Sequence, residues 1–184
     1  MATEWKPKRS RSAPSRYCGR MLKLQRLTGD HLEAVLAFER ENRAYFARSV
    51  TDRGDEFYET FAERFRALLD EQEAGISVFF VLVDGGGSVV GRFNLYDLET
   101  GAAEVGYRVA ERVAGRGVAT AALSNLCRKA ADDHGLRTLT AGTSTANVAS
   151  QRVLEKAGFA LTGTCVVERK RCLKFTRSLA DGLP

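Results

Sequence analysis

The segment that decides the interpretation of this sequence reads Arg112-Val113-Ala114-Gly115-Arg116-Gly117-Val118-Ala119-Thr120. It follows a β-prone stretch at 103–109 and opens a helical pattern at 117–134, so it links a strand to a helix. A helix N-terminus leaves backbone N–H groups without partners, and glycines let a ligand approach them closely. Gly115 and Gly117 therefore favour a phosphate site, to which the arginine between them adds charge and Thr120 adds a hydroxyl. A plain tight turn is the alternative.

Two other phosphate-binding loops do not match this sequence. The chain has no Gly-x-x-x-x-Gly-Lys-Ser/Thr segment, which argues against a nucleoside-triphosphate P-loop. It also has no Gly-x-Gly-x-x-Gly after its first strand with an acid about 20 residues further on, which argues against a dinucleotide-binding fold.

Three consecutive strands are expected before the loop. Apolar stretches at 76–83, 88–96 and 103–109 are separated by turns, the first of which contains Asp84 and three glycines. Further upstream, leucines near 22–27 predict a short strand, and Thr28 is a candidate N-cap for a following helix. Aromatic and leucine residues at helical spacing predict a second helix across 57–69.

After the long helix, the pattern alternates between strands and a helix. It predicts a strand at 136–141, a helix at 146–157 and strands at 159–167 and 172–177. An antiparallel meander that continues into strand–helix units indicates an α+β domain on one mixed, mostly antiparallel sheet of about seven strands.

Composition places the chain among ordinary globular proteins. Its 184 residues, 44% hydrophobic and 28% charged, suit one domain. No apolar run approaches the roughly 18 residues of a membrane span, and the first residues lack the apolar stretch of a secretory signal. We therefore expect a cytosolic protein with no membrane contact.

The net charge of +5 lies entirely in residues 1–20, which hold six Lys and Arg residues and one Glu. The rest of the chain has 22 bases and 22 acids, so the body is neutral. We expect 1–20 to be a disordered basic tail ahead of a domain at 21–184. The alternatives are electrostatic association with RNA or ribosomes, residues upstream of a natural start at Met21, or a tail packed onto the domain.

Cysteine and histidine usage offers no metal site. Cys18, Cys127, Cys165 and Cys172 form no Cys-x-x-Cys pair, and reduced, mostly buried thiols are expected. With two distant histidines in the chain, neither a His-rich metal site nor a His-based triad is easily built.

Two motifs together resemble the GNAT family of acetyl-coenzyme A-dependent N-acetyltransferases. Arg112-x-x-Gly115-x-Gly117 resembles the Arg/Gln-x-x-Gly-x-Gly/Ala signature of that family. Downstream, Asn147-x-x-Ser150 and the 153–159 segment, which ends in Glu-Lys-Ala-Gly-Phe, look like the Rim-type ribosomal-protein-alanine N-acetyltransferases. Glu104-Val-Gly-Tyr107 is also typical, and the element order agrees from residue 21 to about 177.

The resemblance implies a single GNAT-like domain with a V-shaped cleft between the fourth and fifth strands. The pantetheine arm of acetyl-CoA would lie there like an extra strand, next to Tyr107, Arg108 and Val109. The whole 112–120 loop would hold the pyrophosphate, and Asn147 would bind the arm unless it is a pure helix cap. No metal is implied.

The resemblance also implies direct attack by an amine, which must lose a proton. Glu104 is the first candidate base, with a surface carboxylate as its alternative, and Glu168 is a weaker candidate. Many GNAT enzymes carry a tyrosine acid where this chain has Leu154, so Ser150 is the substitute acid; its alternative role is N-capping.

The leading hypothesis is acetyl transfer to a protein N-terminal amine. One alternative keeps the chemistry but takes a small amine, such as an antibiotic, polyamine or amino-acid derivative. Another is a non-catalytic acyl-CoA-binding module. The region at 40–60, including Tyr45 and Phe46, could border the acceptor groove.

Overall fold

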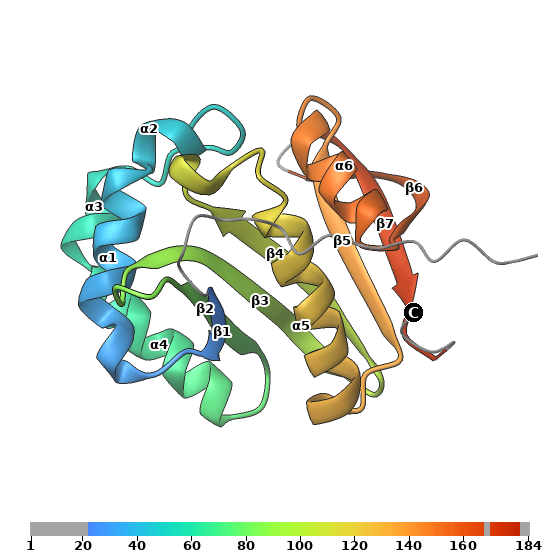
Figure 1. The fold of residues 1–184 in the computed structure, drawn as a ribbon, viewed down its shortest axis with the longest axis horizontal. Coiled ribbons are helices and arrows are strands. Elements are labelled where there is room, and N and C mark those ends of the chain that lie inside the picture. Colours follow the sequence, from blue (N-terminus) through green and yellow to red (C-terminus); the bar gives the residue numbers. More distant parts are fainter. Residues whose placement is uncertain (1–21, 168–169, 181–184) are drawn as a thin grey trace, which may run out of the picture.

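A computed structural model describes residues 22–167 and 170–180. The chain builds one seven-stranded sheet in the order β1-β2-β3-β4-β5-β7-β6 (Figure 1). The strands are β1 (Lys23–Arg26), β2 (Val78–Val83), β3 (Val89–Glu99), β4 (Ala102–Val109), β5 (Thr138–Ser144), β6 (Ala160–Val167) and β7 (Lys170–Ser178). All neighbours are antiparallel except β4 and β5, which run parallel. The predicted mixed α+β sheet is confirmed.

Helices cover both faces of this sheet. They are α1 (Leu32–Glu41), α2 (Arg43–Phe46), α3 (Asp55–Glu59), α4 (Phe61–Glu73), α5 (Val118–His134) and α6 (Val148–Lys156), with short 3-10 turns at Gly29–His31 and Glu111–Val113. Helix α1 packs on β3 and α4 on β2, whereas α5 packs on β3 and against α6. Side chains alternate across a strand, so neighbouring residues of β3 and β4 face different helix layers.

The strands β4 and β5 separate soon after they meet. Their pairing covers three residue pairs, from Ala102 with Thr138 to Glu104 with Thr140. Beyond Glu104 the two strands diverge toward the start of α5 (Figure 1). The expected V-shaped opening between the fourth and fifth strands is therefore present, and it leaves one edge of β4 without a strand partner among the described residues.

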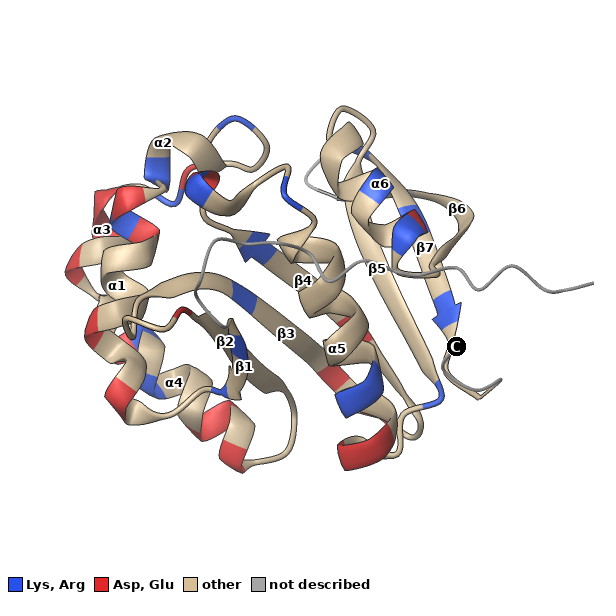
Figure 2. Cartoon of the chain, in the orientation of Figure 1, with Lys and Arg blue, Asp and Glu red and all other residues tan. Residues whose placement is uncertain are grey.

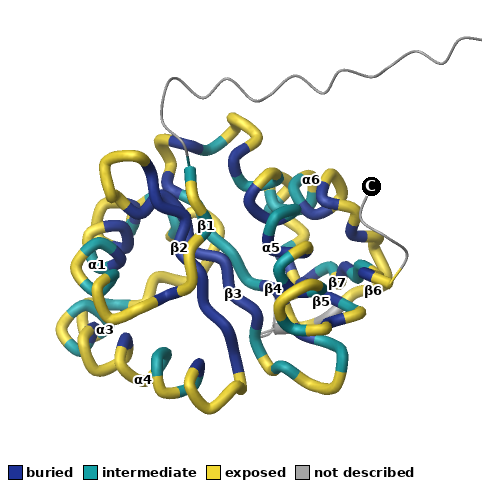
Figure 3. Tube along the Cα trace, turned by 60° about the horizontal axis from the view of Figure 1, so that its bottom comes forward, coloured by how far each residue is buried: buried dark blue, intermediate teal, exposed yellow. Residues whose placement is uncertain are grey.

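The apolar core lies along the middle strands. Every residue of β2 is buried, and β3 is buried through its first seven residues (Figure 3). Phe79, Phe93 and Leu95 are among the largest fully buried side chains, and Leu123 and Leu126 of α5 pack into the same cluster. This rigid centre holds β4, and with it the open edge, in place.

Two expected boundaries were wrong. The helix predicted across 57–69 is two helices that break at Thr60, whose hydroxyl bonds the Glu56 carbonyl at 2.8 Å and so competes with the helical backbone. The strand predicted at 136–141 begins at Thr138, because Gly135 takes a left-handed conformation and the Leu136 N–H closes the end of α5 on Ala130.

Two of the cysteines differ in their oxidation state. Cys127 is free and buried as expected, but Cys172 is disulfide-bonded, so the expectation of reduced thiols was wrong for that residue. No helix in the described part of the chain has the length and apolar character of a membrane span. The tail at 1–20 lies outside the described residues and stays a prediction.

Candidate active site

The loop between β4 and α5 presents backbone N–H groups at the start of a helix of 17 residues. Gly115 and Gly117 both have positive φ, of 71° and 77°, a conformation that strongly favours glycine. A Cβ added to either glycine would meet no protein atom within 4 Å, so the space beside the loop is open. Backbone donors arranged in this way form a concave site for an anion, and the dipole of α5 adds positive potential there.

A groove of about 450 Å³ runs from this loop along the opening beside β4, and we call it the β4–α6 groove. Its volume is in the range of pockets that take cofactors. Ten of the twelve residues predicted to bind the cofactor line it: Tyr107, Arg108, Val109, Gly115, Gly117, Val118, Ala119, Thr120, Asn147 and Ser150. A second hollow of about 400 Å³, next to Arg40 and Asp55 on the α1–α3 side, has no glycine loop, so we do not place the cofactor there.

The other two predicted cofactor residues do not line the groove. Arg112 donates to Asp84 in the turn between β2 and β3, at 3.2 Å. Burial would raise the pKa of Asp84, but N–H groups of Gly86 and Ser88 and the Arg112 guanidinium lower it overall. Arg112 thus fastens the loop to the sheet, and a cofactor role for Arg112 and Arg116 stays a prediction.

The start of α6 forms the wall of the groove opposite the loop. The Asn147 side chain caps this helix by accepting the Ser150 N–H at 3.1 Å. The Ser150 hydroxyl is then left for another partner, and it lies 3.0 Å from the hydroxyl of Tyr107. Burial raises the pKa of Tyr107 to about 12, which the contact with Ser150 offsets in part, so Tyr107 stays protonated at neutral pH. N-capping, the alternative role for Ser150, therefore belongs to Asn147.

Glu104 occupies the point where β4 and β5 separate. It is exposed and lies opposite Tyr96 on β3 and Thr140 on β5. Its carboxylate lies beside Gly142 of β5. The Glu104 Oε1 atom is 4.0 Å from the position that a Cβ atom on this glycine would occupy. Glu104 is an odd number of residues from Tyr107, so it faces the opposite side of the sheet from that phenol. Glu168, the second candidate base, lies outside the described residues.

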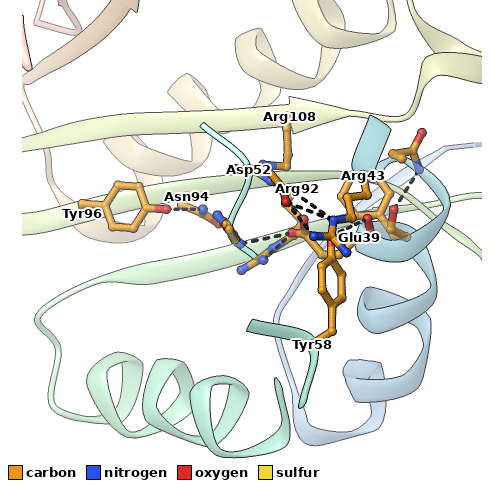
Figure 4. Close-up of polar contacts among 11 residues, drawn as sticks. Glu39, Arg43, Asp52, Tyr58, Arg92, Asn94, Tyr96 and Arg108 are labelled. Carbon is orange, nitrogen blue, oxygen red and sulfur yellow. Dashed lines mark hydrogen bonds and ion pairs between the residues drawn. The ribbon is translucent and has the colours of Figure 1, made fainter. Parts of the chain in front are cut away.

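A buried polar group lies on the same face of the sheet as Glu104, and we call Glu39, Arg53, Arg92 and Arg108 the arginine cluster. Glu39 of α1 has 2% of its side chain exposed, and it accepts from Arg92 of β3 at 2.8 Å and from Arg108 of β4 at 3.0 Å (Figure 4). Arg53 approaches the same carboxylate at 3.8 Å. Next to Arg92 on that face, Asn94 donates to the Tyr96 hydroxyl at 2.6 Å (Figure 4).

Sequence reasoning missed this cluster and part of the groove. Glu39 belonged to a polar run at the end of a helix, and nothing in its spacing indicated burial. Arg152 and Lys156 of α6 also line the groove, and basic positions are visible along that helix (Figure 2). Their spacing of four residues puts both on one helical face, a signal that could have indicated them. Tyr45 and Phe46 line this groove as well, and their expected place beside the acceptor stays a prediction.

Within the part of the chain that is described, no group of His, Cys, Asp and Glu residues is arranged to hold a metal ion. The arrangement instead combines an anion-binding loop, an unpaired strand edge, a carboxylate and a pair of hydroxyls. These are the parts needed to bind a phosphate-containing carrier and to move protons beside it.

Comparisons with known proteins agree with this arrangement. The family model for the acetyltransferase (GNAT) domain matches residues 21–160. A probable N-acetyltransferase, YjcK of Bacillus subtilis, is 27% identical over 150 residues, which cover 77% of this chain and 81% of that protein.

Solved structures share the fold at low identity. A ribosomal-protein-S5-alanine acetyltransferase from Vibrio fischeri has a TM-score of 0.80 at 18% identity, covering 89% of this chain and 96% of the other. A spermidine N-acetyltransferase from Vibrio cholerae, in complex with CoA and spermine, has a TM-score of 0.73 at 15% identity, covering 86% and 96%. With the family match over most of its length, the chain belongs to the GNAT family and is an N-acetyltransferase.

Proposed function

We propose that this enzyme transfers an acetyl group from acetyl-CoA directly to the α-amine of a protein N-terminus. The observation that carries the proposal is the β4–α6 groove, because residues of both sequence motifs line it together. The fold of the S5-alanine acetyltransferase and the Asn147-x-x-Ser150 pattern support an N-terminal amine as the acceptor.

The residues around the groove favour one orientation of acetyl-CoA, with its pyrophosphate at the start of α5 and its pantetheine arm along β4. The N–H groups from Gly115 to the first turn of α5 bind the pyrophosphate, and Arg152 and Lys156 supply charge from α6. The edge of β4 at Tyr107–Val109 has no strand partner on the β5 side in the described structure, so its backbone bonds the pantetheine arm as a neighbouring strand would. The bound thioester supplies an activated acetyl group.

Two residues handle the protons. Glu104 accepts the proton of the attacking amine, directly or through one water, because its side chain is exposed at the point where β4 and β5 separate. The Ser150 hydroxyl hydrogen-bonds the departing thiolate and relays a proton to it from a water molecule, so the hydroxyl itself is protonated again in the same step. Tyr107 holds the Ser150 hydroxyl in position and stays protonated itself. A backbone N–H of β4 stabilises the developing oxyanion.

A thiol-release assay tests this proposal. The enzyme is mixed with acetyl-CoA and, separately, with N-terminal peptides, spermidine and small primary amines. We expect peptides to give the highest kcat/KM and Glu104→Gln to lower it. Faster turnover of spermidine than of every peptide would contradict the proposed acceptor. Turnover of none of the amines, in a protein that still binds acetyl-CoA, would contradict acetyl transfer to amines.

A further inference from the structure

We propose that the arginine cluster is a subsite for an acidic side chain of the acceptor, so that the enzyme prefers N-termini with Asp or Glu one or two residues after the acetylated amine. This inference rests on the proposed function, since it assumes a peptide acceptor. It names which peptides the site selects.

The cluster carries more positive than negative charge. Three guanidinium groups contact one carboxylate, that of Glu39, and no other ion pair links these arginines to an acid in the described residues. The nearby acids Asp52 and Asp55 are both bonded to Arg43, at 2.6 Å each. Because Arg side chains stay charged in proteins, the three arginines and one glutamate give the cluster a net charge of +2.

Burial makes this excess costly without an anion. Arg92 has 8% of its side chain exposed, and Arg108 has 23%. Burial and the neighbouring Arg108 and Arg92 charges lower the pKa of Arg53, and Glu39 offsets them in part. A second carboxylate at this place would relieve the repulsion and form charge-assisted hydrogen bonds.

The cluster also presents donors toward a ligand. Arg108 and Arg53 keep 23% and 38% of their side chains exposed, and their Cζ atoms lie over the rings of Phe46 and Phe57, at 4.8 Å and 4.5 Å from the ring centroids. Ring faces of this kind fix the plane of a guanidinium and leave its edge free to meet a carboxylate.

An independent observation points to a ligand at the same face. Asn94 is 7% exposed, and its Oδ1 atom is buried with no hydrogen-bond partner in the described structure. Buried polar atoms are nearly always bonded, so an unpaired amide oxygen is a place for a donor from outside the chain. Because this atom is fully buried, a water molecule between it and a bound peptide would be such a donor.

The arginine cluster lies next to the β4–α6 groove, so one peptide can place its amine in the groove and an acidic side chain at the cluster. Phe46, Val50 and Arg108 line both the β4–α6 groove and a narrow hollow that also contains Glu39 and Arg53. That hollow is small, about 10 Å³, so the acidic group would sit at its mouth, on the exposed edges of Arg53 and Arg108.

The spacing along β4 sets the length of the acceptor. Glu104 and Arg108 are four residues apart, or about 13 Å in a strand. In this proposal the amine lies between them, within reach of the Glu104 carboxylate directly or through one water. An acidic side chain one or two residues after the amine bridges the remaining distance, whereas the positive amines of spermidine would meet repulsion.

The experiment compares two peptides that begin Ala-Asp and Ala-Asn and are otherwise identical. We expect the enzyme to acetylate the Asp peptide with about tenfold higher kcat/KM, the scale of a hydrogen bond to a charged group. Calorimetry in the presence of CoA should show the same preference in binding. Arg53→Gln should remove most of it.

The control variant is Arg64→Gln. Arg64 also lies over the Phe57 ring, at 5.9 Å, but it is ion-paired with Glu56 outside the cluster. This variant should keep the preference. The shift of Tm by acetyl-CoA shows that both variants are folded.

Each outcome decides the question. Equal kcat/KM and equal binding of the two peptides by wild type would overturn the subsite but leave the proposed function intact. A preference that survives Arg53→Gln would also overturn it. If neither peptide is acetylated, the proposed function fails, and calorimetry with the two peptides still decides whether the cluster binds an acidic side chain.

Discussion

The β4–α6 groove and the arginine cluster meet at Arg108, yet the chain builds them by different means. The groove's anion site comes from consecutive residues, and its donors are backbone N–H groups at positions that strongly favour glycine. The cluster comes from side chains of α1, β3, β4 and the segment after α2, up to 69 residues apart. A backbone site depends on local conformation, whereas a side-chain site depends on the whole fold. Substitutions in the two regions should therefore fail in different ways.

The largest effect on stability is expected in the cluster. Glu39→Gln leaves Arg92 and Arg108 buried without their carboxylate, and breaking a buried ion pair of this kind costs about 3–5 kcal/mol. Denaturant unfolding should show this loss, while Glu41→Gln, an exposed acid of the same helix, should change little. Equal midpoints for wild type and Glu39→Gln would mean that the cluster does not stabilise the fold.

A substitution in the β4–α6 groove should act mainly on acetyl-CoA binding. Gly117→Val should weaken acetyl-CoA binding by more than about 100-fold, or about 2.7 kcal/mol, because a side chain there enters the space beside the N–H groups. Its matched control is Gly75→Val, which has a similar φ of 73° at the end of α4 and the same open surroundings. Both variants carry the same backbone strain. If the two bind acetyl-CoA equally well, the loop does not hold the pyrophosphate.

Glu104→Gln tests the boundary between the two regions. It should lower turnover roughly 10²-fold, the scale of a lost general base, and leave acetyl-CoA binding nearly unchanged. Glu99→Gln, at the far end of β3, serves as the control. Full activity of Glu104→Gln would move the role to Glu168 or to water.

A smaller effect is expected from Tyr107→Phe, about tenfold in kcat, because it removes the hydroxyl that positions Ser150. The raised pKa keeps the phenol neutral and donating below about 12, and the contact is lost only as pH rises toward that value. Wild type and Tyr107→Phe should therefore have pH–rate profiles of the same shape between pH 6 and about pH 10. A basic limb near pH 9 that vanishes in Tyr107→Phe would contradict the raised pKa.

The smallest effect is expected from removing residues 1–20. A chain that starts at Met21 should bind acetyl-CoA and acetylate a short peptide like the full chain, since the basic charge of the tail lies apart from a neutral body. Any loss toward a ribosomal particle should shrink as salt is added. A Tm several degrees lower would show instead that the tail packs on the domain.

The same contrast explains what the sequence could predict. The order of strands and helices and the loop at Gly115 and Gly117 follow from periodicity and from glycine positions, which are local signals. The break at Thr60 depends on one hydroxyl that competes for a backbone carbonyl, and helical spacing does not reveal it.

Side-chain partners were less accessible to prediction. The burial of Glu39 depends on arginines from two strands that are distant in sequence, so a polar run gave no indication of it. The contact between Tyr107 and Ser150 joins residues 43 apart in the chain. Such contacts exist only once the sheet has brought α6 over β4.

The most direct test of the account is the position of the acetyl group on a product. A peptide with a free N-terminal alanine, Asp at its second position and one internal lysine is incubated with enzyme and acetyl-CoA. Tandem mass spectrometry then locates the modification. We expect acetylation of the α-amine that depends on Glu104 and Gly117. Acetylation confined to the lysine, or none in a protein that binds acetyl-CoA, would contradict it.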